Sequence, residues 1–91
     1  MTQRIRILLA DDHAVVRQGF RLILASQPDM EIVGEAGDGN EAVSLASTLR
    51  PHVVVMEVAM PQLNGIEATR RIAEAAPGVR VLALSMHKDK V

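Results

Sequence analysis

Three acidic side chains follow directly after apolar runs, where each could do chemistry at the end of a buried strand. Asp11 and Asp12 follow the first such run, and Glu57 follows the run at 53–56. Four apolar residues in succession leave no face for water, so 53–56 is predicted to be a strand buried on both sides. A carboxylate at the end of such a strand lies at the edge of a parallel sheet where α/β folds place their ligands.

These carboxylates would converge if their two strands were neighbours. Two like charges about 4 Å apart repel by about 4 kcal/mol at an effective dielectric constant of 20, so a cation must offset the repulsion. Oxygen ligands with room for water are what Mg²⁺ binds. A salt-bridged acidic cluster is the alternative, but the local sequence offers no Lys or Arg partner. Asp12 alone would be explained equally well as the cap of the following helix.

The elements that must position these acids follow from apolar periodicity and from turn residues. Strands are predicted at 4–10, 30–34, 53–56 and 79–84, and helices at 13–26, 38–49 and 64–76. Alternating strands and helices are typical of a parallel α/β sheet with right-handed crossovers.

Local signals refine two of these elements. Asn64 with Glu67, and Asp38 with Glu41, have capping-box spacing at the starts of the last two helices. The last helix is expected to bury Ile66, Thr69 and either Ile72 or Ala73. The strand at 79–84 is apolar enough that we expect it to be covered on both faces.

Four segments together are far more specific than any one of them: ILLADDH at 7–13, EAGDGNEAV at 35–43, VVVMEVAMPQLNGIEATRRI at 53–72 and VLALSMH at 81–87. They resemble the receiver domain of two-component response regulators of the NarL/FixJ (LuxR) type. The resemblance implies that 1–91 is a receiver domain with a flavodoxin-like, doubly wound sheet in the order 2-1-3-4-5. By the same resemblance the fold is incomplete, because the fourth helix, the fifth strand with its lysine and the fifth helix are absent, and Lys88 and Lys90 lie too early.

The resemblance also assigns roles to residues. It implies Asp12 and Glu57 as direct Mg²⁺ ligands, Asp11 as a ligand through water, the backbone carbonyl of Ala59 as a further ligand, and Ser85 as the switch hydroxyl. Glu57 occupies the position of the aspartate that accepts a phosphoryl group from a sensor histidine kinase.

Glutamate at that position changes the expected chemistry. Its side chain is longer by about 1.5 Å, one carbon–carbon bond, and a misplacement of 1 Å can cost about 100-fold in rate. Normal phosphotransfer to Glu57 is therefore not expected, and the substitution weakens or abolishes Mg²⁺ binding. Glu57 either imitates the activated form weakly or inactivates the switch, and the sequence leaves both open.

The composition of the chain argues against direct binding to nucleic acid or a membrane. A formal net charge of -1 gives no strong attraction to nucleic acid, and Phe20 is the only aromatic residue, so bases cannot stack on aromatic platforms. No cysteine is present, and no apolar run approaches the length of about 20 residues that spans a membrane, so a cytoplasmic location is expected. The resemblance implies DNA binding only through a helix-turn-helix domain that this chain lacks. An uncovered fourth strand predicts dimers or exchanged segments.

Two alternative functions belong to classes other than a phosphorylated receiver. A pseudo-receiver would act in protein–protein association without phosphate, and loss of Mg²⁺ affinity would favour it. A Mg²⁺-dependent phosphatase on a similar sheet would need an aspartate nucleophile with a second acid two residues later, which Glu57-Val58-Ala59 does not supply. His13 lies beside the acidic pair but is better explained as a solvated residue at a helix start, and the spacing of the three histidines does not predict a zinc site.

Overall fold

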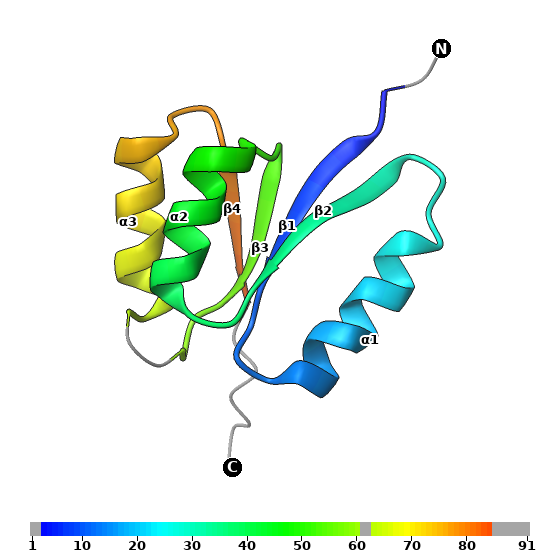
Figure 1. Ribbon diagram of the computed structural model, residues 1–91, viewed down its shortest axis with the longest axis horizontal. Helices are drawn as coiled ribbons and strands as arrows, with labels where there is room; N and C mark the ends of the chain where they lie inside the picture. The colour runs from blue at the N-terminus through cyan, green and yellow to red at the C-terminus, as the bar shows by residue number, and fades with distance from the viewer. Residues whose placement is uncertain (1–2, 61–62, 85–91) are drawn as a thin grey trace.

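The computed structural model describes residues 3–60 and 63–84, in which four strands alternate with three helices (Figure 1). The elements are β1 (Ile5–Ala10), α1 (Ala14–Ala25), β2 (Met30–Ala36), α2 (Gly39–Leu49), β3 (Val53–Glu57), α3 (Gly65–Ala75) and β4 (Arg80–Leu84). The predicted order is confirmed. β2 continues two residues beyond its predicted end, because Glu35 and Ala36 still pair with Leu9 and Ala10 of β1.

All strand pairs are parallel, and the order across the sheet is β2-β1-β3-β4. This is the flavodoxin-like arrangement that the sequence predicted. The register sets the positions of the acids: Ala10, the last residue of β1, pairs with Met56, and Glu57 pairs with Leu84 at the end of β4. Asp11 and Glu57 therefore leave neighbouring strands at the same edge of the sheet.

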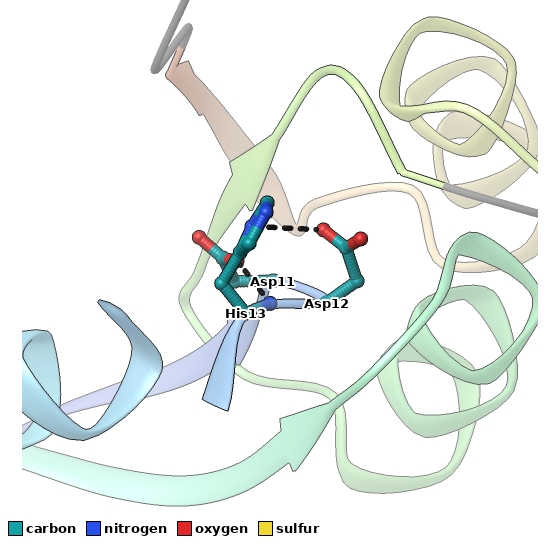
Figure 2. A group of neighbouring side chains, drawn as sticks. All are labelled: Asp11, Asp12 and His13. Carbon is teal, nitrogen blue, oxygen red and sulfur yellow. Dashed lines mark hydrogen bonds and ion pairs between the residues drawn. The ribbon is translucent and has the colours of Figure 1, made fainter. Parts of the chain in front are cut away.

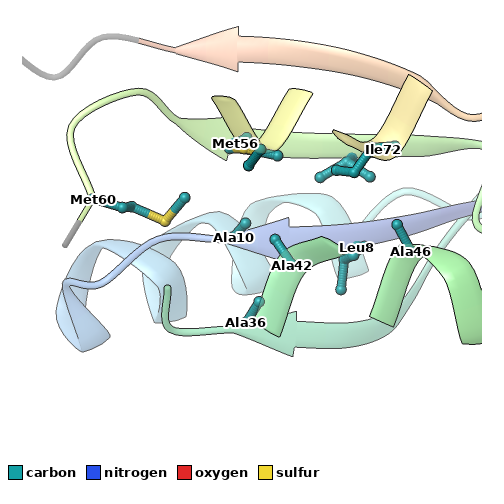
Figure 3. Packing of buried hydrophobic residues seen from close by; sticks show 10 residues of the cluster. Leu8, Ala10, Ala36, Ala42, Ala46, Met56, Met60 and Ile72 are labelled. Carbon is teal, nitrogen blue, oxygen red and sulfur yellow. The ribbon is translucent and has the colours of Figure 1, made fainter. Parts of the chain in front are cut away.

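Helices cover both faces of the sheet, with α1 on one side and α2 and α3 on the other (Figure 1). Small residues on α2 and α3 allow these helices to approach the strands closely, which buries a continuous core (Figure 3). Met56 and Met60 are both buried in it. The cluster consists of Leu8, Ala10, Ala36, Ala42, Ala46, Val54, Met56, Met60, Ala68 and Ile72.

The prediction that β4 is covered on both faces is wrong. Val81 packs on the core, but Leu82 is 55% exposed. Leu82 pairs with Val55, so its side chain lies on the same face of the sheet as α1. Because α1 packs on β1 and β2, this face of β4 remains open in the described part of the chain.

The buried stripe of α3 is displaced by one residue from the prediction. Ile72 is buried as expected, whereas Ile66 is 71% exposed. Gly65 and Ala68 occupy the buried positions near the helix start, which places Ile66 on the outer side. Thr69 is half-buried, and its hydroxyl donates to the Gly65 carbonyl at 2.6 Å.

Candidate functional site

A close group of three side chains lies where β1 ends and α1 begins. One potential ligand atom from each of Asp11, Asp12 and His13 lies within 4.8 Å of the others. Figure 2 shows the imidazole between the two carboxylates, with His13 Nδ1 at 3.1 Å from Asp11 Oδ1 and 3.2 Å from Asp12 Oδ1. Asp11 is only 6% exposed, whereas Asp12 and His13 face solvent. The group is therefore anchored at a buried carboxylate and open on its outer side.

The turn that forms this group is closed by Asp11 rather than Asp12. The Asp11 Oδ1 atom accepts a hydrogen bond from the His13 backbone N–H at 2.7 Å, the geometry of an Asx turn. The N-cap of α1 is His13, which makes no capping hydrogen bond with its side chain. The alternative explanation of Asp12 as the cap of α1 is therefore not supported, and the Asp12 carboxylate meets the His13 ring instead.

Glu57 is buried at the last position of β3, with only 4% of its surface exposed. Its Oε1 atom accepts from the backbone N–H of Ala59 at 3.4 Å. Glu57 and Asp11 line the same small cavity, about 10 Å³ in volume, which Phe20 and Arg17 of α1 also line. Glu57 does not belong to the close group of Asp11, Asp12 and His13, so the structure places it beside that group at the same sheet edge.

Backbone contacts hold the loop that carries Ala59. The Gly65 N–H donates to the Val58 carbonyl at 2.7 Å, and a Cβ on Gly65 would lie 2.7 Å from the Glu57 carbonyl oxygen. Only glycine permits this approach of α3 to the end of β3. Asn64 caps α3 as predicted, because its Oδ1 accepts from the Glu67 N–H at 2.9 Å. Ser85, the predicted switch hydroxyl, lies outside the described residues.

Arg17 is a site residue that the sequence analysis missed. Its Nη1 donates to the backbone carbonyl of Asp11, and its Nε donates to Glu35 Oε1 at 2.9 Å. The sequence immediately around the acids offers no Lys or Arg, but Arg17 reaches the turn from α1, where it binds the Asp11 backbone carbonyl and the Glu35 carboxylate. The available signal was the position of Arg17 three residues before Phe20, on the side of α1 that faces the sheet.

The donor set suits a hard divalent cation. Asp11 and Asp12 offer carboxylate oxygens in close proximity, and oxygen ligands at 2.0–2.1 Å with retained water are what Mg²⁺ takes. His13 now pairs with both carboxylates, so a cation would displace its ring from them.

The comparisons with known proteins agree with this fold and site. A family model described as the response regulator receiver domain matches residues 7–91. The transcriptional regulatory protein DegU of Brevibacillus brevis is 42% identical over 96% of the chain, and LiaR of Bacillus subtilis is 46% identical over 96%. A LuxR-family two-component response regulator from Aurantimonas superposes with a TM-score of 0.88 at 40% identity, covering 94% of this chain and 61% of that one.

The fold and its acidic edge define a flavodoxin-like signalling domain. The chain belongs to the response regulator receiver domain family, and most of the relatives it matches are transcriptional regulators of the NarL/LuxR type, although one, from Thermotoga maritima, is a protein-glutamate methylesterase. Receiver domains of this family bind Mg²⁺ at an acidic cluster, which here corresponds to Asp11 and Asp12 with His13 beside them. The chain spans 37% of the length of DegU and 42% of that of LiaR. Within the described residues, the helices are all too short or too polar to cross a membrane.

Proposed function

We propose that this chain is the phosphorylation-type signalling domain of a regulator of transcription in which Glu57 replaces the phosphoacceptor. The position of Glu57 carries the proposal: it is the buried last residue of β3, beside Asp11 at the carboxyl edge of the sheet. Ligand sites of doubly wound folds lie at that edge. A sensor histidine kinase and a DNA-binding output domain are the partners that follow from membership of the family, and a cytoplasmic location is proposed for the chain itself.

In the proposed site, Asp12 and Glu57 contact Mg²⁺ directly, Asp11 acts through water, and the Ala59 carbonyl completes the protein ligands. Bound Mg²⁺ supplies neutralisation of phosphoryl oxygens during transfer. The chain holds the ligand groups in position. Asp11 is fixed by the turn at His13, and Ala59 is fixed by the loop that the Gly65 N–H bonds at Val58. Ser85 is proposed as the switch hydroxyl, which would bond a phosphoryl oxygen in the activated state.

Glu57 changes what this site can do. A phosphoryl group brings roughly -1.5 to -2 charges, whereas the Glu57 carboxylate brings one. Its longer side chain displaces the carboxylate from the position an aspartate would take, so phosphoryl transfer to it is blocked and Mg²⁺ binding is weakened but still measurable. Whether this carboxylate acts as a weak imitation of the phosphorylated form or as an inactive residue is decided by experiment.

The test is Glu57→Asp, measured by intact mass after incubation with acetyl phosphate and Mg²⁺. We expect the variant to gain one phosphoryl mass and the unsubstituted chain to gain none. Glu57→Asp combined with Asp12→Asn is the matched control and should not be modified, because it lacks a direct metal ligand. Phosphorylation could require residues after position 91, so the same measurement is repeated on any longer product of the gene. Failure of Glu57→Asp to gain mass in both forms would refute the proposed role of position 57.

The exposed apolar side chains favour a second candidate, a pseudo-receiver that acts by association. Leu22 and Ile23 of α1 and Leu82 of β4 are each more than half exposed. Exposed apolar surface at an edge strand promotes pairing between chains. Calorimetric titration with MgCl₂ separates the two candidates: measurable binding supports the receiver, and its absence together with self-association supports the pseudo-receiver.

A further inference from the structure

The backbone of Asp11 is held from two sides. Its N–H donates to the carbonyl of Ala36, at the end of β2, at 3.0 Å. Its carbonyl lies beyond the last pair of β1 with β3, Ala10 with Met56, and accepts from Arg17 Nη1 instead. A buried carbonyl without a partner is costly. Arg17 therefore supplies a hydrogen bond to the one residue that both closes the acidic turn and lines the cavity with Glu57.

Arg17 is itself fixed by a second contact. Its Nε donates to Glu35 Oε1 at 2.9 Å, while Arg21 Nε lies 3.3 Å from the other oxygen of that carboxylate. The Arg17 side chain is 23% exposed, and that of Arg21 is 50% exposed. A planar guanidinium holds its donors on separate nitrogens in a rigid fork, whereas the three donors of a lysine ammonium share one nitrogen and rotate freely. Arg17 thus links α1, the end of β2 and the turn after β1.

We propose that Arg17 is a positioning residue for the divalent-cation site, acting through Asp11 without contact with the ion. This inference rests on the proposed function, because it assumes that Asp11 and Asp12 hold Mg²⁺. Two effects of Arg17 on a cation are opposed. Its positive charge repels the ion, while its hydrogen bond holds the turn that carries the ligands. The Glu35 carboxylate reduces the positive charge of Arg17 at 2.9 Å and is shared with Arg21, so we expect the positioning effect to be the larger of the two.

The test compares Arg17→Gln with Arg21→Gln in the 91-residue chain, by calorimetric titration with MgCl₂. Both variants remove a positive charge from the same Glu35 carboxylate, but only Arg17 contacts Asp11. We expect Arg17→Gln to weaken Mg²⁺ binding on the order of tenfold, as for other residues that orient metal ligands, and Arg21→Gln to change it less than twofold. Arg17→Lys should recover part of the loss. Tighter binding in Arg17→Gln, equal effects of both Gln variants, or full recovery in Arg17→Lys would overturn the proposal.

A second measurement needs no metal, so a failure of the proposed function can be recognised separately. The His13 amide donates to Asp11 Oδ1, so its hydrogen exchange reports on the turn in the metal-free chain. We expect exchange of this amide to accelerate several-fold in Arg17→Gln and to stay unchanged in Arg21→Gln. If the unsubstituted chain binds no Mg²⁺, the metal role fails, and positioning of the turn is judged on this amide alone. Unchanged exchange in Arg17→Gln would then overturn the positioning role.

Discussion

Gly39 shows how a single residue without a side chain sets the distance between α2 and the loop before α3. A Cβ at this position would lie 1.8 Å from the Leu63 carbonyl oxygen and 2.7 Å from the Leu63 carbonyl carbon. Both atoms belong to the backbone, so no rotamer change relieves the clash. Leu63 lies just before α3, in the same connection from β3 that carries the Ala59 carbonyl of the proposed site, so Gly39 contributes to the placement of that connection from the neighbouring helix α2.

Gly39→Ala should therefore destabilise the domain. The cost of forcing atoms into a packed region is roughly 1–3 kcal/mol, which urea unfolding followed by circular dichroism would measure. Gly19→Ala is the matched control, because a Cβ at Gly19 in the middle of α1 meets nothing within 4 Å. It should raise the free energy of unfolding by about 0.5–1 kcal/mol, since alanine favours the helix. Equal stability of Gly39→Ala and the unsubstituted chain would contradict the close approach.

The contacts of Arg17 could not be predicted from the sequence. The chain order predicted that Asp11, Asp12 and Glu57 reach one edge, because parallel strands end together. It did not predict which atoms meet, since Arg17 and Glu35 are 18 residues apart and belong to different elements. Likewise, the choice between Asp12 and Asp11 at the turn depends on backbone dihedrals near His13, which residue preferences for caps do not encode.

At the scale of elements, α3 carries a charged outer face. The Glu67 carboxylate pairs with Arg70, and with Arg71 at 3.2 Å, while Arg70 also pairs with Glu74 at 2.9 Å. Glu67 therefore does not turn back to complete the capping box, because its carboxylate is used by two arginines on the following turn. The hydrogen bonds from Arg70 and then Arg71 lower the pKa of Glu67 from its ordinary value of 4.5.

This pKa shift predicts a pH-dependent contribution to stability. A carboxyl whose pKa is lower in the folded state stabilises the fold at pH values above its unfolded pKa, and the contribution disappears as the pH falls through the folded pKa. Glu67→Gln should thus lower Tm slightly at pH 7, on the order of 1 °C for an exposed pair, with the difference vanishing once the pH has fallen below the lowered pKa of Glu67. Glu74→Gln, which loses one of these contacts, should show a smaller effect. A difference in Tm that persists at low pH would argue against this origin.

The positions of the strands and helices could be predicted better than which of their residues are buried. Apolar periodicity located the four strands and three helices of the described residues, because burial against a sheet imposes a period of two or 3.6 on any chain. It failed where burial depends on what lies opposite. Ile66 begins α3 on the outer side because Gly65 is needed at the close contact with β3, and Leu82 is exposed because α1 covers a different part of the sheet.

At the scale of the whole molecule, the helices cover the two faces of the sheet to different extents. On one face α2 and α3 bury a continuous core that includes Met56 and Ile72. On the other face α1 packs on β1 and β2, and none of its residues is buried. The acidic edge lies between the α1 layer and the α2–α3 layer. The hydrogen bond from Arg17 of α1 to the Asp11 carbonyl therefore connects the less buried layer to the site. Within the described residues, the site is therefore held more firmly on the α3 side than on the α1 side.

This asymmetry predicts self-association through the open face. Leu22 and Ile23 of α1 and Leu82 of β4 expose apolar surface, and β4 is an edge strand of the described sheet. Sedimentation velocity over micromolar concentrations should show a sedimentation coefficient that rises with concentration. Leu82→Lys should weaken the association at least about tenfold, because a lysine on an edge strand opposes pairing.

Ile66→Lys provides the control for this experiment. Ile66 is 71% exposed, more than Leu82, but it lies on α3, across the sheet from α1. If association depends on general surface hydrophobicity, both variants should weaken it to a similar degree. If the open face of β4 is the contact, only Leu82→Lys should do so, while circular dichroism shows both variants folded. A chain that stays monomeric at every concentration would rule out association, and with it the pseudo-receiver as an association module.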